Sequence, residues 1–322
     1  MSSYRRATRR RRARRAALVG GVAAAGLVGA AAWADRRDAG DPWDPDARRF
    51  PEGDERRVSA DDGIELAVTV AGPADGPTVV LSHCWTGSRA IWGPVAERLV
   101  EAGHRVVLYD QRGHGESTYG TEPPTIAMLA HDLRAVIDDV GADDLVLAGH
   151  SMGGMSIQSY AAEHPGHFKE HVRAVVLVAT AARTIGRPLP LPAIDRVLGD
   201  RYPAWAGRGV VGRSVVRGSL GAARQRAHVD LTLDGWARTS GYARAGFLAA
   251  MAGMDLTTAL DDCAIPVTVV VGTRDTLTPV RYARQLVAGI PGSDLTVLPG
   301  AGHMLPLERP DEVTAAIQGL DA

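Results

Sequence analysis

A serine flanked by glycines, between an apolar strand and a helix, is the feature that most constrains this chain. The sequence GHSMGG at residues 149–154 follows the apolar run DLVLAGH and precedes a helical pattern. Such a unit requires a sharp turn, which strains the backbone of Ser151 and lifts its hydroxyl above a sheet. Side chains at Gly149 and Gly153 would collide with the neighbouring strand and helix. The pattern therefore predicts that Ser151 is a nucleophile.

A serine nucleophile needs a base, and the base needs an acid that orients it. Asp275 follows a strand predicted at Val267–Thr273, and His303 follows a strand predicted at Leu295–Pro299. Both residues lie at the carboxyl ends of strands, where open α/β sheets place their sites. Because serine, acid and histidine occur in this order, each at the end of a predicted strand, we predict that Ser151, Asp275 and His303 form a catalytic triad.

The chain from about residue 57 onward alternates short apolar runs with segments of helical spacing. Strands are predicted at Ile64–Ala71, Thr78–His83, Arg105–Asp110, Asp144–His150, Val172–Thr180, Val267–Thr273 and Leu295–Pro299. Helices are predicted at Ile91–Ala102, Ile126–Val140, Met152–His164, Pro279–Ile290 and Glu308–Leu320. Strands joined by helix-length connections predict a mostly parallel sheet with helices on both faces.

One long segment interrupts this alternation. Residues 182–264 contain no convincing strand pattern, but they carry many arginines and apolar residues such as Trp205, Trp236 and Phe247. We interpret this segment as a helical lid inserted into a core formed by residues 57–181 and 265–322.

These motifs resemble those of the α/β-hydrolase superfamily, near its lidded esterases, cofactor-free haloperoxidase-like enzymes and carbon–carbon bond hydrolases. The resemblance runs from about Arg57 to the C-terminus and is carried by GHSMGG, by DQRGHGES at residues 110–117 and by GAGHMLPLERP at residues 300–310. It implies an α/β-hydrolase fold with eight strands. It also implies an oxyanion hole formed by the backbone N–H groups of Trp85 and Met152.

The loop of residues 82–88 departs from the family pattern, because Cys84 replaces the glycine expected after His83. This replacement leaves the geometry of the oxyanion hole open. Cys84 could be a second nucleophile or a redox sensor, but no histidine and acid are assigned to it, so the sequence favours a buried spacer. Asp110, Arg112 and the histidines outside the triad are interpreted as residues that shape loops.

No metal or organic cofactor is predicted. His164, His167 and His171 could suggest a metal site, but Pro165 and Gly166 interrupt the helical pattern between them. This arrangement favours a surface turn. The two cysteines, Cys84 and Cys263, provide neither a disulfide framework nor a zinc-binding pattern.

The N-terminal segment has the features of a targeting sequence. Residues 1–15 contain eight arginines, and the nineteen residues from 16 to 34 carry no charge. As a helix, this uncharged stretch would span about 28 Å, close to the thickness of a bilayer core. We expect export or membrane anchoring with the catalytic domain outside the cytoplasm, through either a cleaved signal or an uncleaved anchor. The alternative is a cytoplasmic protein with a basic arm. Residues 35–56 are predicted as a linker.

Charge argues against nucleic acid as a partner. No acidic residue precedes Asp35, so the chain after residue 34 carries 28 basic and 37 acidic residues, a net charge of −9. Such an acidic body is a poor match for a phosphate backbone. The sequence leaves the oligomeric state open.

The predicted function is hydrolysis of a carboxylic ester, lactone or thioester of a small to medium lipophilic substrate through an acyl-enzyme. The same triad would also serve an acyltransferase or perhydrolase, or a carbon–carbon bond hydrolase, although that last group usually has asparagine where His150 stands. An alternative from another class is a non-catalytic ligand-binding protein that keeps the fold.

Overall fold

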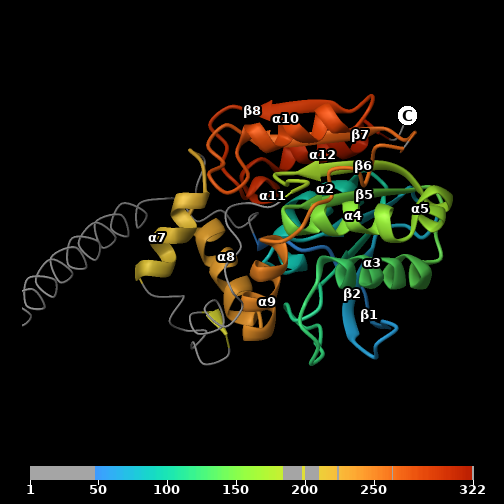
Figure 1. Cartoon of the computed structure of the whole chain (residues 1–322), viewed down its shortest axis with the longest axis horizontal. Coiled ribbons are helices and arrows are strands. Elements are labelled where there is room, and N and C mark those ends of the chain that lie inside the picture. Colours follow the sequence, from blue (N-terminus) through green and yellow to red (C-terminus); the bar gives the residue numbers. More distant parts are fainter. Residues whose placement is uncertain (1–47, 184–197, 200–209, 223–224, 263, 321–322) are drawn as a thin grey trace, which may run out of the picture.

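The computed structural model describes residues 48–183, 198–199, 210–222, 225–262 and 264–320. In these residues one sheet of eight strands has the order β1-β2-β4-β3-β5-β6-β7-β8 (Figure 1). The strands are β1 Gly53–Ser59, β2 Glu65–Ala71, β3 Thr78–Ser82, β4 Arg105–Tyr109, β5 Leu145–His150, β6 Val172–Val178, β7 Val267–Gly272 and β8 Asp294–Leu298. Strand β2 pairs antiparallel with β1 and β4, and the other pairs are parallel. The predicted α/β-hydrolase fold is confirmed.

Helices cover both faces of the sheet, as helix-length connections between parallel strands require. One face packs against α3 Ile126–Val140, α4 Met152–Glu163, α5 Pro165–His171 and α10 Val280–Gly289. The other packs against η2 Arg89–Trp92, α2 Gly93–Glu101, α11 Leu305–Glu308 and α12 Pro310–Gln318. The central strands β3 and β5 are buried along their whole length because both of their faces are covered.

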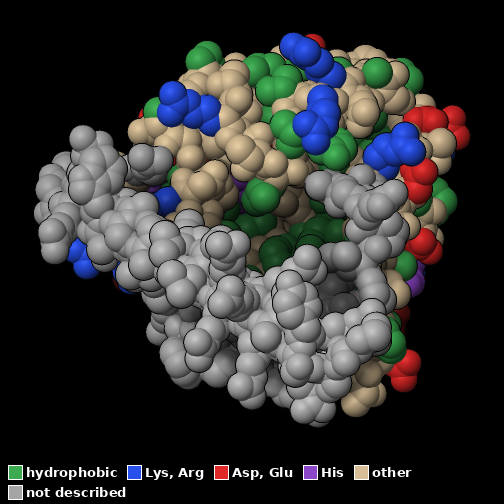
Figure 2. All heavy atoms as spheres, turned by 60° about the vertical axis from the view of Figure 1, so that its left-hand side comes forward, with side chains coloured by type: hydrophobic (Ala, Val, Ile, Leu, Met, Phe, Trp, Pro, Cys, Tyr) green, Lys and Arg blue, Asp and Glu red, His purple; other side chains and the backbone are tan. Residues whose placement is uncertain are grey.

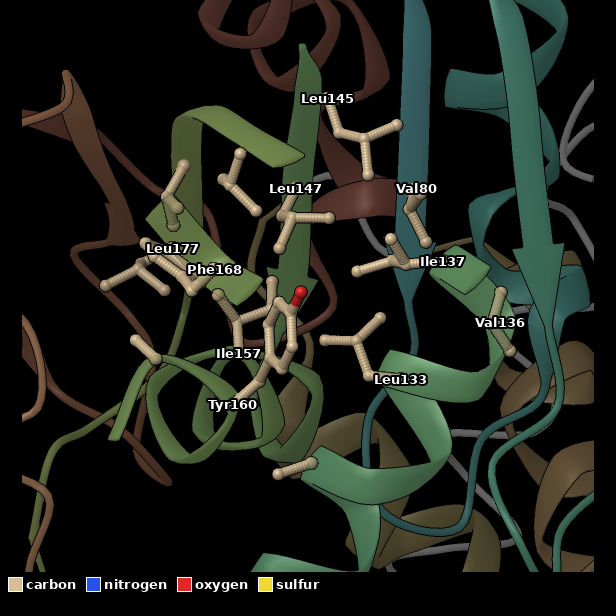
Figure 3. Packing of buried hydrophobic residues seen from close by; sticks show 14 of the residues in the cluster. Val80, Leu133, Val136, Ile137, Leu145, Leu147, Ile157, Tyr160, Phe168 and Leu177 are labelled. Atoms are coloured by element: carbon tan, nitrogen blue, oxygen red, sulfur yellow. The ribbon is translucent and has the colours of Figure 1, made fainter. Parts of the chain in front are cut away.

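The core between the sheet and its helices is built from aliphatic side chains (Figure 3). Leu147 of β5 and Leu177 of β6 face Leu133 of α3 and Ile157 of α4 in this cluster. Helix α3 has clear ends: the Thr125 hydroxyl accepts the Met128 N–H (3.2 Å), and Gly141 closes the helix in the left-handed conformation (φ +58°). These caps fix the start and the end of α3 beneath the sheet.

Three helices between β6 and β7 form the described part of the segment predicted as a lid. They are α7 Val210–Ser219, α8 Arg226–Arg238 and α9 Gly241–Met251, and they lie to one side of the sheet in Figure 1. Backbone hydrogen bonds join this segment to the loops after β8 and β4: His303 N–H donates to Ser219 O (2.7 Å), and Ser240 N–H donates to Gly113 O (2.9 Å). The helices therefore lie over the carboxyl ends of the parallel strands.

Two local predictions were wrong. Strand β1 begins at Gly53, inside the segment predicted as a linker, because its pairing with β2 uses backbone groups while its side chains, apart from Val58, remain largely exposed and show no apolar alternation. Residues 165–171 form helix α5 instead of a surface turn. Pro165 ends α4 but occupies the first turn of α5, where its missing N–H is tolerated.

The predicted targeting segment lies outside the described residues. Among the residues that the structure describes, no helix is long and apolar enough to span a membrane.

Replacing Leu133 with alanine tests the packing between α3 and the sheet. Leu133 is fully buried, so Leu133→Ala is expected to lower the free energy of unfolding by about 2–5 kcal/mol through lost contacts and a cavity. The neighbouring exposed residue provides a matched control: Arg134→Ala on the same helix should change that free energy by less than about 0.5 kcal/mol. Denaturant unfolding followed by circular dichroism measures both, and equal effects would contradict the assigned core.

Candidate active site

Ser151 lies at the turn between β5 and α4 in a strained backbone conformation, with φ +53° and ψ −113°. The strain is held by hydrogen bonds. The Ser151 N–H donates to Val178 O (2.9 Å), and its carbonyl accepts the Thr180 hydroxyl (2.6 Å) and the Gly154 N–H (3.0 Å). A non-glycine residue with such a φ costs about 1–3 kcal/mol, and strain of this kind concentrates at functional sites.

The glycines around Ser151 are required by close packing. A Cβ atom on Gly149 would lie 2.6 Å from the backbone of Gly153, and one on Gly153 would overlap the carbonyl of Ser82 on β3. A Cβ on Gly154 would lie 2.7 Å from the side chain of Thr180. The collisions predicted from the GHSMGG pattern are therefore present in the fold, on both sides of Ser151.

Asp275 and His303 come together at the ends of β7 and β8. The Nδ1–H of His303 donates to Asp275 Oδ2 at 2.9 Å, and both side chains are almost fully buried. Burial opposes ionisation of the carboxyl group, but the charge of His303 and hydrogen bonds from His303 and Thr278 outweigh it and lower the pKa of Asp275 to about 2. Asp275 is thus an ionised acceptor that orients the His303 ring through Nδ1.

Thr278 belongs to this arrangement and was missed by the sequence reasoning. Its hydroxyl lies 2.6 Å from Asp275 Oδ2, 2.8 Å from Ala179 O and 3.2 Å from His303 Nδ1. The backbone N–H groups of Leu277 and Thr278 both donate to Asp275 Oδ1 at 2.8 Å. An aspartate followed three residues later by threonine is a turn signal in the sequence, and it could have pointed to this residue.

His150 links the serine turn to the loop of His303. No hydrogen bond joins Ser151 to His303 within the described residues; instead, His150 Nε2–H donates to the His303 carbonyl at 2.8 Å, and the two imidazole rings lie 5.0 Å apart. Burial and the neighbouring His303 lower the pKa of His150 to about 3, so His150 is neutral. Catalytic hydrogen bonds often tighten only when substrate is bound.

Two neutral histidines hold the loop of residues 82–88. His83 donates from Nδ1 to Cys84 O (2.8 Å) and accepts the Gln111 N–H at Nε2 (2.9 Å). His114 accepts the Thr86 N–H at Nε2 (3.2 Å). Burial lowers the pKa of His83 to about 4 and that of His114 to about 3, and only the neutral ring can accept these N–H groups. Both histidines shape the loop, as predicted.

The two N–H groups predicted for the oxyanion hole remain available. Within the described residues, neither the Trp85 N–H nor the Met152 N–H makes a backbone hydrogen bond. Met152 begins α4, so its N–H points out of the first helical turn, where an anion is favoured. Cys84 is buried next to Gly87, and burial raises the pKa of its thiol to about 12.

Asp110 and Arg112 stabilise the loop after β4, as predicted. Asp110 accepts the N–H groups of Arg89 (2.8 Å) and Glu116 (3.0 Å). The Arg112 guanidinium binds Asp132 in a bidentate pair (2.6 and 2.5 Å) that is buried beneath the sheet edge.

The surface histidines bind neighbours rather than one centre. His167 contacts Asp138 and His171 contacts Asp143. Among the described residues, no group of three or more suitable side chains is arranged to hold a metal ion.

Known proteins are similar to this chain over most of its length. A family model described as alpha/beta hydrolase fold matches residues 77–310, about three quarters of the chain. The chain belongs to the α/β-hydrolase family. This α/β hydrolase is 27% identical over 268 residues to a bifunctional esterase/perhydrolase from Acinetobacter calcoaceticus, with 80% of this chain and 95% of the relative covered.

Other relatives of this α/β hydrolase carry out related chemistries. It is 27% identical over 266 residues to a non-heme haloperoxidase from Rhodococcus erythropolis, covering 80% of this chain and 96% of the relative. It superposes on the enol-lactonase from Burkholderia xenovorans LB400 with a TM-score of 0.71 at 26% identity, covering 82% of this chain and 99% of that one. Together with the family, these similarities identify the chain as a hydrolase.

The buried thiol of Cys84 is expected to be inert in the folded protein. Alkylation requires the thiolate, and burial raises the pKa of this group to about 12. Incubation with iodoacetamide at about pH 8 should leave Cys84 unmodified in the native protein and modify it fully in guanidinium, as measured by peptide mass spectrometry. Rapid alkylation of the native protein at Cys84 would restore the interpretation of this residue as a second nucleophile.

Proposed function

We propose that this α/β hydrolase is a serine esterase that cleaves carboxylic esters, lactones or thioesters of small to medium lipophilic substrates through an acyl-enzyme on Ser151. The observation that carries the proposal is the strained turn at Ser151 beside a buried, hydrogen-bonded Asp275–His303 pair. A serine hydroxyl on a strained strand–helix turn and an oriented imidazole on neighbouring loops are the two parts that acyl transfer to serine needs.

In the proposed mechanism His303 accepts the hydroxyl proton while Ser151 Oγ attacks the carbonyl carbon. The negative charge that develops on the carbonyl oxygen is stabilised by the N–H groups of Trp85 and Met152. Asp275 keeps Nδ1 of His303 protonated and stabilises the imidazolium. His303 then returns the proton to the leaving alcohol or thiol. Water, deprotonated by the same histidine, attacks the acyl-enzyme and releases the acid and free Ser151.

The surroundings of Ser151 support a lipophilic substrate. Met152 and Trp85, which carry the proposed oxyanion N–H groups, belong to an apolar cluster with Met155 of α4 and Phe247 of α9. Figure 2 views the molecule from the side of α7–α9, and hydrophobic side chains lie at the bottom of a hollow near the centre of that face. An apolar wall beside a few convergent polar groups is the usual composition of a small-molecule site.

Acyl transfer to a peroxide is the second candidate, and one observation favours it. The relative from Acinetobacter calcoaceticus is described as both an esterase and a perhydrolase. The first half-reaction would be identical, and the acyl-enzyme would pass its acyl group to hydrogen peroxide instead of water. Measuring peracid formation from an ester and hydrogen peroxide separates the two functions.

A fluorophosphonate probe tests the nucleophile directly. We expect labelling of Ser151, identified by peptide mass spectrometry, and hydrolysis of p-nitrophenyl esters. Ser151→Ala should abolish both while the protein remains folded, because the other triad residues alone leave only a small fraction of the rate. Ser156→Ala, on the same helix and also buried, is the matched control and should retain activity. Full activity in Ser151→Ala would refute the serine mechanism.

Thr278 is expected to act on the rate through Asp275 and His303. Thr278→Val removes the hydroxyl that contacts Asp275 Oδ2 and Ala179 O. The loss of a buried hydrogen bond should lower kcat for ester hydrolysis on the order of tenfold, with KM nearly unchanged. Thr278→Ser keeps the hydroxyl and should retain most of the activity. Loss of activity in Thr278→Ser with retention in Thr278→Val would show that packing of the methyl group matters instead.

A further inference from the structure

Glu308 is a buried carboxylate close to His303 that the proposed mechanism does not use. It is the last residue of α11, five positions after His303, and it is only 5% exposed. Among the described residues it forms no ion pair with a basic side chain. Its three hydrogen-bond donors are all backbone N–H groups. The carboxylate therefore acts on the backbone segments that carry these groups.

These donors come from two segments that are far apart in the sequence. Glu308 Oε2 accepts the N–H groups of Gly302 (3.0 Å) and Gly221 (2.6 Å), and Oε1 accepts the N–H of Met304 (3.1 Å). Gly302 and Met304 are the two neighbours of His303 in the chain. Gly221 lies in the turn between α7 and α8, within the predicted lid. One carboxylate thus binds both sides of the histidine and the segment packed above it.

The two segments also contact each other directly through their backbones. His303 N–H donates to Ser219 O (2.7 Å), and Ala222 N–H donates to Gly300 O (2.8 Å). A Cβ atom on Gly221 would overlap Gly300 O, and a Cβ on Gly302 would overlap Gly221 N. The contact leaves no room for side chains at these two positions, so the Ser219–Ala222 turn and the His303 loop fit together in one arrangement.

We propose that Glu308 is a positioning residue that docks the Ser219–Ala222 turn of the lid onto the His303 loop and thereby fixes the catalytic imidazole. This role rests on the proposed function, because it assumes that His303 acts as the base. The side chain of His303 is held by Asp275 and its backbone by Ser219 and His150. Glu308 holds the backbone N–H groups of the residues on either side of it. A shift of the loop would move Nε2 away from Ser151, and small displacements of a base lower rates strongly.

A carboxylate is the group that this position needs. Both of its oxygens only accept hydrogen bonds, which matches three N–H donors that approach from two sides. The amide of glutamine would direct an NH₂ group at one of these donors, and aspartate is shorter by one methylene group. Burial outweighs the three N–H donors and raises the pKa of Glu308.

The experiment compares Glu308→Gln and Glu308→Asp with Glu312→Gln. Glu312 is partly exposed on α12 and pairs with Arg309, so its substitution is the matched control. In both Glu308 variants we expect kcat for p-nitrophenyl ester hydrolysis and the rate of fluorophosphonate labelling to fall on the order of ten- to hundredfold, with KM changed less than about threefold. Glu312→Gln should match the wild type.

Hydrogen exchange supplies a readout that does not depend on activity. In Glu308→Gln, amide exchange should accelerate in peptides that cover residues 215–222 and 299–306 and remain unchanged in peptides from β5 and α3. If Glu308→Gln does not fold, Gly221→Ala disturbs the same contact from the lid side and should reproduce both the loss of kcat and the local acceleration.

Two results would overturn the proposal. Wild-type kcat with unchanged local exchange in Glu308→Gln would show that Glu308 does not hold the two segments. A loss of activity that matches a loss of folded protein, with exchange accelerated throughout the chain, would assign Glu308 to general stability. If the wild type neither labels nor hydrolyses esters, the proposed function fails, while local exchange in Glu308→Gln still decides whether Glu308 docks the two segments.

Discussion

The geometry of the proposed site depends on the strained backbone of one residue, Ser151. Ser151 keeps a left-handed backbone (φ +53°) because β5 hydrogen-bonds to β3 on one side and to β6 on the other, while α4 packs back against the same strands. The carbonyl of Val178 on β6 receives the Ser151 N–H, and the carbonyl of Ser82 on β3 leaves no room for a side chain at Gly153. The parallel sheet with helices on both faces therefore stabilises the strained backbone conformation and positions the serine hydroxyl.

The electrostatics of the site follow from burial. Three histidines outside the proposed triad are neutral because burial lowers their pKa values. His83, in the loop that carries Trp85, accepts a backbone N–H group, His114 accepts a backbone N–H group of that loop, and His150 donates to the backbone carbonyl of His303. Asp275 remains ionised in the same environment because His303 and Thr278 donate to it. Of these four histidines, only His303 contacts a buried carboxylate, that of Asp275. His303 is also the one proposed to change its charge during the reaction.

Local patterns in the sequence predicted the features that depend on local spacing. The strand and helix around Ser151, and the strands that precede Asp275 and His303, were predicted from runs of apolar residues and from glycine positions, and the observed strands agree. The hydrogen bond between Asp275 and His303 could be expected once both lay at neighbouring strand ends. The contacts of Thr278 with the Ala179 carbonyl and of His150 with the His303 carbonyl could not, because a distant segment brings each carbonyl into reach. The same holds for Glu308, whose partner Gly221 is 87 positions away in the sequence. Strand β1 was not predicted, because its exposed, charged residues carry no apolar alternation.

Helices α7–α9, the described part of the predicted lid, pack on the same loops that carry the proposed catalytic groups. Besides the contact between Gly221 and Gly302, α8 approaches the loop of Trp85 so closely that a Cβ on Gly235 would lie 2.7 Å from Thr86 O. Helix α9 meets the loop after β4, where a Cβ on Gly113 would lie 2.8 Å from Ala243 Cβ. Interfaces packed at this density have few alternative arrangements, because small displacements create overlaps rather than gradual losses of contact. Helices α7–α9 are therefore not independent of the proposed site. A substitution at these contacts would move the loop of Trp85 or the loop of His303, so we expect substrate preference and reaction rate to change together.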